Sequence, residues 1–149
     1  MNAIKNFDEF IKQGTVKKQT PDKNRASFLS AESETNYAFL LEMVSKIPVA
    51  EKNANTYIKT CYDIIMERVR AKMISEGYNA IGNGAHEAEI SYLRNMGFKE
   101  NDIQFADQMR YYRNSITYYG KRLDTEYAIK VIEYTKKIYH QLKEKGNGT

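Results

Sequence analysis

Apolar residues recur at helical spacing through most of this 149-residue chain, and proline interrupts none of the long periodic segments. The two prolines, Pro21 and Pro48, fall between those segments. Because proline disrupts a helix interior, this placement permits long helices. No segment alternates apolar and polar residues for long enough to predict a sustained strand. The pattern therefore predicts an all-α fold, an up-and-down antiparallel bundle of five to six helices forming a single domain over residues 1–149.

Capping residues and glycines indicate where the helices begin and end. Thr20 followed by Pro21 is a start signal for the second helix, and Asp124 is an N-cap residue for the last one. Gly120 stands where a left-handed residue ends a helix, so we expect the fifth helix to end by Tyr119. The segments expected to be helical are about 4–13, 21–47, 53–75, 86–96, 100–119 and 125–145, followed by a frayed tail at 146–149.

Positive charge is concentrated near the end of the chain. Residues 1–107 carry 14 basic and 15 acidic side chains, whereas residues 108–149 carry 9 basic and 4 acidic ones. Seven of the twelve tyrosines lie in the same final stretch. Basic groups beside aromatic faces suit a nucleic-acid or phosphate partner. A solvated helix with tyrosines at the edge of the core has the same composition, so composition leaves both interpretations open.

Several classes of protein do not fit the sequence. No apolar run approaches the roughly 18 residues of a membrane span, and the opening MNAIKNFDEF has no apolar stretch typical of a signal peptide. The single cysteine, Cys61, cannot form an internal disulfide, and it falls on an apolar stripe typical of the core. No cluster has metal-ligand spacing, and GNGA at 82–85 lacks the lysine of a phosphate-binding loop. We therefore expect a cytoplasmic protein with no metal, no cofactor and no membrane contact.

The stretch best suited to chemistry is DQMRYYRNSITYYGKR, at residues 107–122. Arg110 and Arg113 lie one helical turn apart, and two such guanidinium groups can donate paired hydrogen bonds to phosphate oxygens. The alternative is structural, since cations are favourable near a helix C-terminus and Arg110 can pair with Asp107. The candidate phosphate-binding residues are Arg110, Arg113, Asn114, Thr117, Lys121 and Arg122.

RNSITYYG at residues 113–120, preceded by Arg110 and followed by an amphipathic helix, resembles the signature of HEPN domains (higher eukaryotes and prokaryotes nucleotide-binding). That signature is an arginine, usually then a polar residue such as asparagine, and a histidine after four to six intervening residues. EFIKQGTVKKQTPDKNRASFLSAE resembles the first helix, loop and second-helix start of the family. TYIKTCYDIIMERVRAKMISEGYNAIG followed by HEAEISYL resembles its central helix pair. The resemblance covers about residues 7–144.

The resemblance implies a small helical bundle, often dimeric, in which two copies of the motif face a shared cleft. Many members of the family are metal-independent ribonucleases, and several are toxins restrained by a nucleotidyltransferase antitoxin. Others bind nucleotides or act as adaptors. By this resemblance Arg113 would stabilise charge on the scissile phosphate, while the motif histidine would handle the proton of the ribose 2′-hydroxyl. The implied partners are RNA or a nucleotide, an antitoxin and a second copy of the chain.

The sequence departs from the signature at the histidine, where Tyr118 stands. A tyrosine phenol has an ordinary pKa of about 10, so as a general base at pH 7 it starts roughly 4 kcal/mol behind a histidine. Residues 113 and 118 also lie about 140° apart on an ideal helix, so Tyr118 can approach Arg113 only if the helix loosens or ends near residues 117–118. Because Gly120 favours such an end, we expect Tyr118 to turn toward Arg113. Arg113 and Tyr118 are the candidate catalytic residues, in a site that binds RNA or nucleotide phosphate with weak or no ribonuclease activity.

Two other functions remain open at this point. The chain can be a ribonuclease toxin, with Tyr118 activated by Arg113 and neutralised by the antitoxin. It can instead be a non-catalytic dimeric interaction or adaptor module, with both residues paired across the dimer interface. Glu67 is a candidate for holding Arg113 in place, whereas His86 and His140 are expected to be capping or surface residues.

Overall fold

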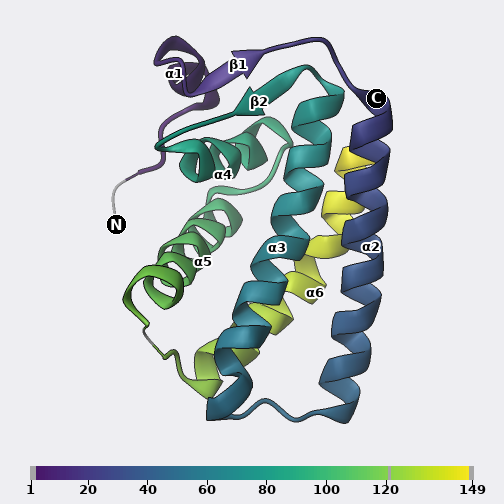
Figure 1. Cartoon of the computed structure of the whole chain (residues 1–149), viewed down its shortest axis with the longest axis vertical. Coiled ribbons are helices and arrows are strands. Elements are labelled where there is room, and N and C mark those ends of the chain that lie inside the picture. The colour runs from purple at the N-terminus through teal and green to yellow at the C-terminus, as the bar shows by residue number, and fades with distance from the viewer. Residues whose placement is uncertain (1–2, 121, 148–149) are drawn as a thin grey trace.

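The computed structural model describes residues 3–120 and 122–147 and confirms the all-α class (Figure 1). The helices of this part of the chain are joined by short connections, and a two-stranded sheet lies at one end. The elements are α1 (Phe7–Lys12), β1 (Val16–Lys18), α2 (Lys23–Lys46), α3 (Glu51–Ser75), β2 (Tyr78–Ala80), α4 (Ala85–Asn95), α5 (Glu100–Tyr119) and α6 (Thr125–Asn147).

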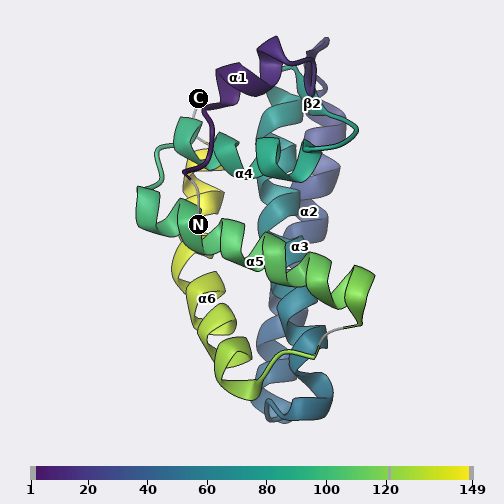
Figure 2. The same cartoon turned by 90° about the vertical axis from the view of Figure 1, so that its left-hand side faces the viewer.

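The three longest helices stand side by side, and α4 and α5 cover one side of them. As the short connection at Pro48 predicts, α2 and α3 run antiparallel (Figure 1). In contrast, α6 runs in the same direction as α3, because α4 and α5 carry the chain back to the far end of the bundle before α6 begins. Figure 2 shows α5 lying across both α3 and α6. The motif-bearing helix therefore crosses the bundle instead of extending it.

The central helix is α3, which contacts α2, α4, α5 and α6. Its side chains are buried on most sides, in agreement with the broad apolar face of its sequence. Cys61 is fully buried there, and burial raises the pKa of its thiol to about 12. The burial confirms the expected core role of Cys61, and a thiol that does not ionise is a poor nucleophile.

The small sheet was not predicted, because three-residue strands are too short to show a periodicity. Val16 pairs with Ala80 in antiparallel register, and Gln19 N–H donates to Gly77 O at 2.8 Å just beyond the ladder. Gly77 has φ +87°, and a Cβ at that position would lie 2.6 Å from Gln19 O. Only glycine allows the two segments to approach so closely.

The first helix was expected from about residue 4, but α1 begins at Phe7, because Asn6 is its N-cap and its N–H donates to the Glu9 carboxylate. The other helix ends agree with the sequence signals, with two corrections. Gly120 has φ +63° after α5, and the Asp124 carboxylate accepts from Tyr127 N–H at 2.7 Å, as predicted. The N-cap of α2 is Asp22 and not Thr20, because backbone hydrogen bonds hold residues 19–22 in an extended strap on the end of α3. The second correction concerns the tail, since residues 146–147 continue α6 where fraying was expected, while 148–149 lie outside the described residues.

None of the helices in the described residues is both long enough and apolar enough to cross a lipid bilayer.

Candidate functional site

Arg113 lies on the side of α5 that faces α3. Its guanidinium carbon is 5.4 Å from the centre of the Tyr62 ring, and Nη2 is 3.4 Å from Asp63 Oδ1. The Arg113 side chain is 29% exposed and that of Asp63 is 51% exposed. The guanidinium is therefore supported by an aromatic ring on one side and remains open to solvent on another.

The hydrogen-bonding capacity of this site is only partly used. Arg113 Nε and the Tyr62 hydroxyl are both buried, and neither has a hydrogen-bond partner among the residues that the structure describes. Most buried polar groups in folded proteins have a partner, so two unpartnered groups in one ion–ring pair are unusual. Arg113 is thus held in place by stacking and by one acid, with donors left over.

Arg110, one turn earlier, is more fully engaged. Its Nε donates to Asp107 Oδ1 at 2.7 Å, and Nη1 lies 3.8 Å from Glu87 Oε1 on α4. The pairing with Asp107 is the structural alternative that the sequence allowed for this arginine. Arg110 therefore joins α5 to α4 and offers less of its guanidinium to a ligand than Arg113 does.

A third arginine, Arg70 on α3, was not predicted to belong here. Its Nε and Nη2 donate to the two carboxylate oxygens of Glu89 on α4, at 2.8 and 3.2 Å. His86 Nδ1 lies 3.3 Å from the same carboxylate, and the His86 side chain is mostly exposed. His86 is therefore a surface residue that lies beside Glu89, in agreement with the expectation from sequence.

These three arginines surround one buried phenol. Burial raises the pKa of the Tyr62 hydroxyl above its ordinary value and Glu89 raises it further, whereas Arg70, Arg110 and Arg113 oppose the shift. We refer to Arg70, Arg110 and Arg113 around Tyr62 as the arginine cluster. Helices α3, α4 and α5 all contribute to it, and sequence reasoning identified only the two arginines of α5.

The carboxylate beside Arg113 differs from the expected one. Glu67 instead accepts a hydrogen bond from Asn36 Nδ2 of α2 at 3.3 Å, and burial raises its pKa. Asp63, one turn earlier on α3, takes the place predicted for Glu67. Arg113 of α5 meets α3 at Asp63 and not at Glu67. One helical turn shifts a side chain by about 5.4 Å along the axis, which is enough to exchange one acid for the other.

The other predicted residues extend from the cluster toward the end of α5. Asn114 is partly exposed, and Thr117 and Arg122 are exposed. Thr117 lies one turn after Arg113 on the same side of α5, whereas Asn114 lies about 100° around the helix and Arg122 lies beyond its end. The side chain of Tyr118 and the whole of Lys121 lie outside the described residues. Helix α5 ends at Tyr119, as predicted, but the backbone of Tyr118 is still part of the helix, about 140° around the axis from Arg113. The helix end therefore does not itself bring Tyr118 to Arg113, and their approach stays a prediction.

His140, the other histidine, is exposed on α6 with its ring 6.4 Å from those of Tyr37 and Tyr139. It is a surface residue, as expected from sequence.

No family model, curated protein or solved structure matches this chain. Within residues 3–120 and 122–147, no three His, Cys, Asp or Glu side chains are grouped so that they could hold a metal ion. The chemistry open to the site therefore depends on its own side chains, above all on Arg113.

Proposed function

We propose that this chain is a HEPN-like domain that binds RNA or nucleotide phosphate at Arg113, with weak or no ribonuclease activity. One observation supports the proposal most directly. The Arg113 guanidinium rests on Tyr62, is partly open to solvent, and has a single acid, Asp63, at 3.4 Å among the described residues.

This arrangement favours an anion over the existing ion pair. Asp63 is half exposed, and exposed ion pairs contribute only about 0–1 kcal/mol. A charge-assisted hydrogen bond to a phosphate is worth roughly 1.5–3 kcal/mol. Because the Tyr62 ring already holds the guanidinium, little side-chain entropy is lost when a phosphate binds. A phosphate oxygen can therefore compete with Asp63 for Arg113.

The weak or absent cleavage follows from the bases available. RNA cleavage through the 2′-hydroxyl needs a base poised near neutral pH, which a histidine supplies and a tyrosine does not. Tyr118 stands at the histidine position of the motif, and burial raises the pKa of the Tyr62 phenol still further from neutrality. We therefore expect binding to be retained and turnover to be slow.

Binding is tested by fluorescence anisotropy with a labelled single-stranded RNA oligonucleotide. Arg113→Gln should weaken binding about tenfold, because one charge-assisted contact is lost. Lys46→Gln removes the same charge from an exposed site on α2 and is the matched control, with little expected effect. Equal affinity of the wild type and Arg113→Gln, with no dependence on salt, contradicts the proposal.

Cleavage is tested by incubating the pure protein with a mixed RNA pool. Tyr118→His should cleave markedly faster than the wild type, because the variant restores an imidazole to a site that still binds phosphate. If the wild type itself cleaves efficiently and Tyr118→Phe abolishes the activity, the ribonuclease toxin with a nucleotidyltransferase antitoxin becomes the better interpretation.

A second candidate is a dimeric interaction module, favoured by the exposed aromatic face of α2. Phe28 and Phe39 are largely exposed, and their 11-residue separation places them about 20° apart around the helix. A second copy of the chain packed on this face would bury both rings. Light scattering should then give a dimer for the wild type and a monomer for Phe39→Ser, whereas a monomeric wild type excludes this role.

A further inference from the structure

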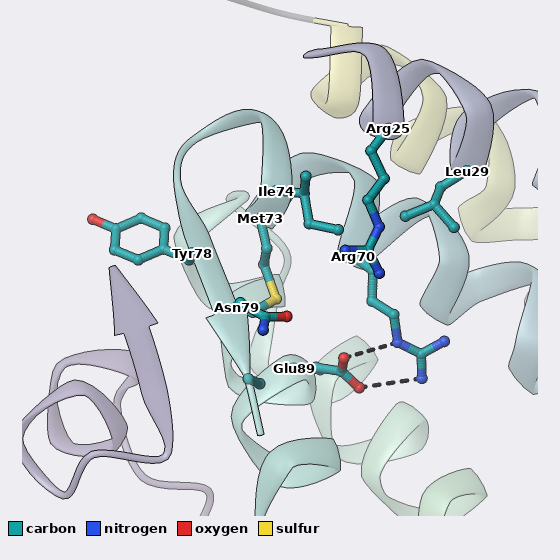
Figure 3. Close-up of a pocket in the computed structure, with 9 residues that line it drawn as sticks. Arg25, Leu29, Arg70, Met73, Ile74, Tyr78, Asn79 and Glu89 are labelled. Carbon is teal, nitrogen blue, oxygen red and sulfur yellow. Dashed lines mark hydrogen bonds and ion pairs between the residues drawn. The ribbon is translucent and has the colours of Figure 1, made fainter. Parts of the chain in front are cut away.

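A cavity that Arg113 does not line lies between the start of α2, the end of α3, strand β2 and helix α4, with Arg70 of the arginine cluster in one wall (Figure 3). We refer to it as the α2–β2 cavity. Its volume is about 240 Å³. The lining residues that matter here are Arg25, Leu29, Arg70, Met73, Asn79 and Glu89.

The walls of this cavity are fixed by backbone hydrogen bonds. Asp22 N–H donates to Ile74 O at 3.1 Å, which ties the start of α2 to the end of α3. The Asp22 carboxylate then accepts from Arg25 N–H at 2.9 Å and caps the helix. Arg25 is therefore set beside the end of α3 before any ligand binds, and a site formed in advance loses less entropy on binding.

Of the two arginines that line the cavity, Arg70 is paired with a carboxylate, whereas Arg25 has no acidic partner among the described residues. Both carboxylate oxygens of the buried Glu89 accept from Arg70, so that pair is neutralised. Arg25 is exposed, and its guanidinium makes no hydrogen bond or ion pair with any residue in the described part of the chain. Figure 3 shows the Arg25 side chain extending from α2 toward Arg70. The cavity therefore carries one uncompensated positive charge.

The rest of the lining is largely apolar. Met73 and Ile74 of α3 are buried, and Leu29 of α2 is partly buried one turn after Arg25. Asn79 of β2 adds one amide that can donate a hydrogen bond. A free cation beside an apolar wall matches a ligand with an anionic group on an apolar body. The volume lies below the roughly 300–1,000 Å³ of drug-sized sites, so the body is compact.

We propose that the α2–β2 cavity binds a small amphiphilic anion, namely a phosphate monoester or carboxylate attached to a compact apolar or aromatic group. Arg25 binds the anionic group, and Leu29 and Met73 contact the apolar part. The Arg70–Glu89 pair forms one wall without taking the ligand charge. This site uses neither Arg113 nor Tyr62, so it does not depend on the function proposed above.

The experiment is a titration of the full ¹⁵N-labelled chain with phenyl phosphate, followed by the backbone amides of Asn79 and Ala80. We expect saturable shifts with phenyl phosphate. Inorganic phosphate, which lacks the apolar group, and phenol, which lacks the charge, should both bind at least tenfold more weakly. Benzoate forms a parallel arm, and its affinity relative to phenyl phosphate identifies which anionic group the site prefers.

Two variants and one control decide the outcome. Arg25→Gln should weaken phenyl phosphate binding about tenfold, and it removes no ion pair of the described residues that the fold needs. Leu29→Ala should weaken phenyl phosphate more than inorganic phosphate. Lys46→Gln, the control, removes an exposed charge of α2 that lines neither site and should bind phenyl phosphate as the wild type does. The proposal is overturned by absence of saturable shifts at these amides, by unchanged binding in Arg25→Gln, or by inorganic phosphate binding as tightly as phenyl phosphate.

Discussion

Two arginines, Arg68 of α3 and Arg113 of α5, each stack on a tyrosine ring but lie in different environments. The guanidinium carbon of Arg68 lies 5.3 Å from the Tyr139 ring centre, and that of Arg113 lies 5.4 Å from the Tyr62 ring centre. Both have a buried Nε without a hydrogen-bond partner among the described residues. Arg68, however, is only 4% exposed, and its Nη2 donates to Glu34 at 2.8 Å and to the Tyr139 hydroxyl at 3.1 Å.

The difference shows which arginine is structural. A buried cation is tolerated only when it is paired and hydrogen-bonded, and Arg68 meets that condition by joining α2 and α6 to α3. Lys143 of α6 reinforces the junction through Glu34 at 2.8 Å. Arg113 has a single neighbouring acid, Asp63, at the longer distance of 3.4 Å, and its side chain is 29% exposed. Ring stacking and an unpartnered Nε are therefore common to both arginines, and what distinguishes Arg113 is its greater exposure and its longer contact with a single acid.

The largest expected effect of this contrast is on stability. Arg68→Ala should lower the free energy of unfolding by about 2–4 kcal/mol, because it opens a cavity under Tyr139 and leaves two polar groups without their donor. Arg113→Ala should cost about 1 kcal/mol or less. Urea denaturation followed by circular dichroism measures both. Arg68→Met, which keeps much of the packing, should lie between them, and equal losses for the two alanine variants would remove the distinction.

A smaller effect is expected from the two phenols. Tyr139→Phe removes the oxygen that accepts from Arg68 and should cost about 1 kcal/mol of stability. Tyr62→Phe removes a buried hydroxyl that has no partner among the described residues, so it should be neutral within about 0.5 kcal/mol or slightly stabilising. The same denaturation curves test this pair. A large loss in Tyr62→Phe would mean that the hydroxyl has a partner after all.

A third prediction concerns the acids beside the two arginines. Asp63→Asn should raise the affinity for single-stranded RNA about threefold, because it removes the carboxylate that competes with phosphate for Arg113. Glu34→Gln removes the same charge beside Arg68 and should leave the RNA affinity nearly unchanged. The anisotropy titration at low salt measures both variants, and the gain should shrink as salt is added. Equal gains would indicate a general charge effect.

The smallest predicted effect is on the pH dependence of stability. A hydrogen bond from Lys143, together with the charges of Lys143 and Arg68, lowers the pKa of Glu34 below its ordinary value of 4.5, although desolvation opposes this. The ionised carboxylate therefore stabilises the fold above the unfolded-state pKa, and the contribution is lost as the pH falls through the lower folded-state pKa. Urea midpoints measured from about pH 5 to about pH 3 should fall more steeply for the wild type than for Glu34→Gln.

Much of the fold was predictable because its signals are local. The apolar stripe of α5, the cap at Asp124 and the left-handed Gly120 each depend on residues within one or two turns, and all three are as predicted. The Arg110–Asp107 pair was open to prediction for the same reason, since the two residues are three apart on one helix. The start of α2 was misplaced because a tertiary contact, the strap at residues 19–22, overrides the Thr20–Pro21 signal.

The candidate site was less predictable because its members come from several helices. Tyr62 and Asp63 on α3 and Glu87 on α4 carry no signal that relates them to α5, and only the crossing of the helices brings them to Arg113 and Arg110. Glu67 was a reasonable choice on the correct helix, displaced by one turn. Similarly, the Arg70–Glu89 pair joins residues 19 apart that no helical spacing connects.

The sequence by itself determined the helices, most of their ends and the position of two arginines one turn apart, since hydrogen bonds within a helix and the burial of an apolar stripe are set by neighbouring residues. Tertiary structure alone decided that Arg68 is buried and joins three helices, whereas Arg113 remains partly exposed to solvent. The physical reason is that the electrostatic free energy of a guanidinium depends on how many acids and how much water surround it. Those surroundings are supplied by other helices, whose crossing points no local pattern encodes.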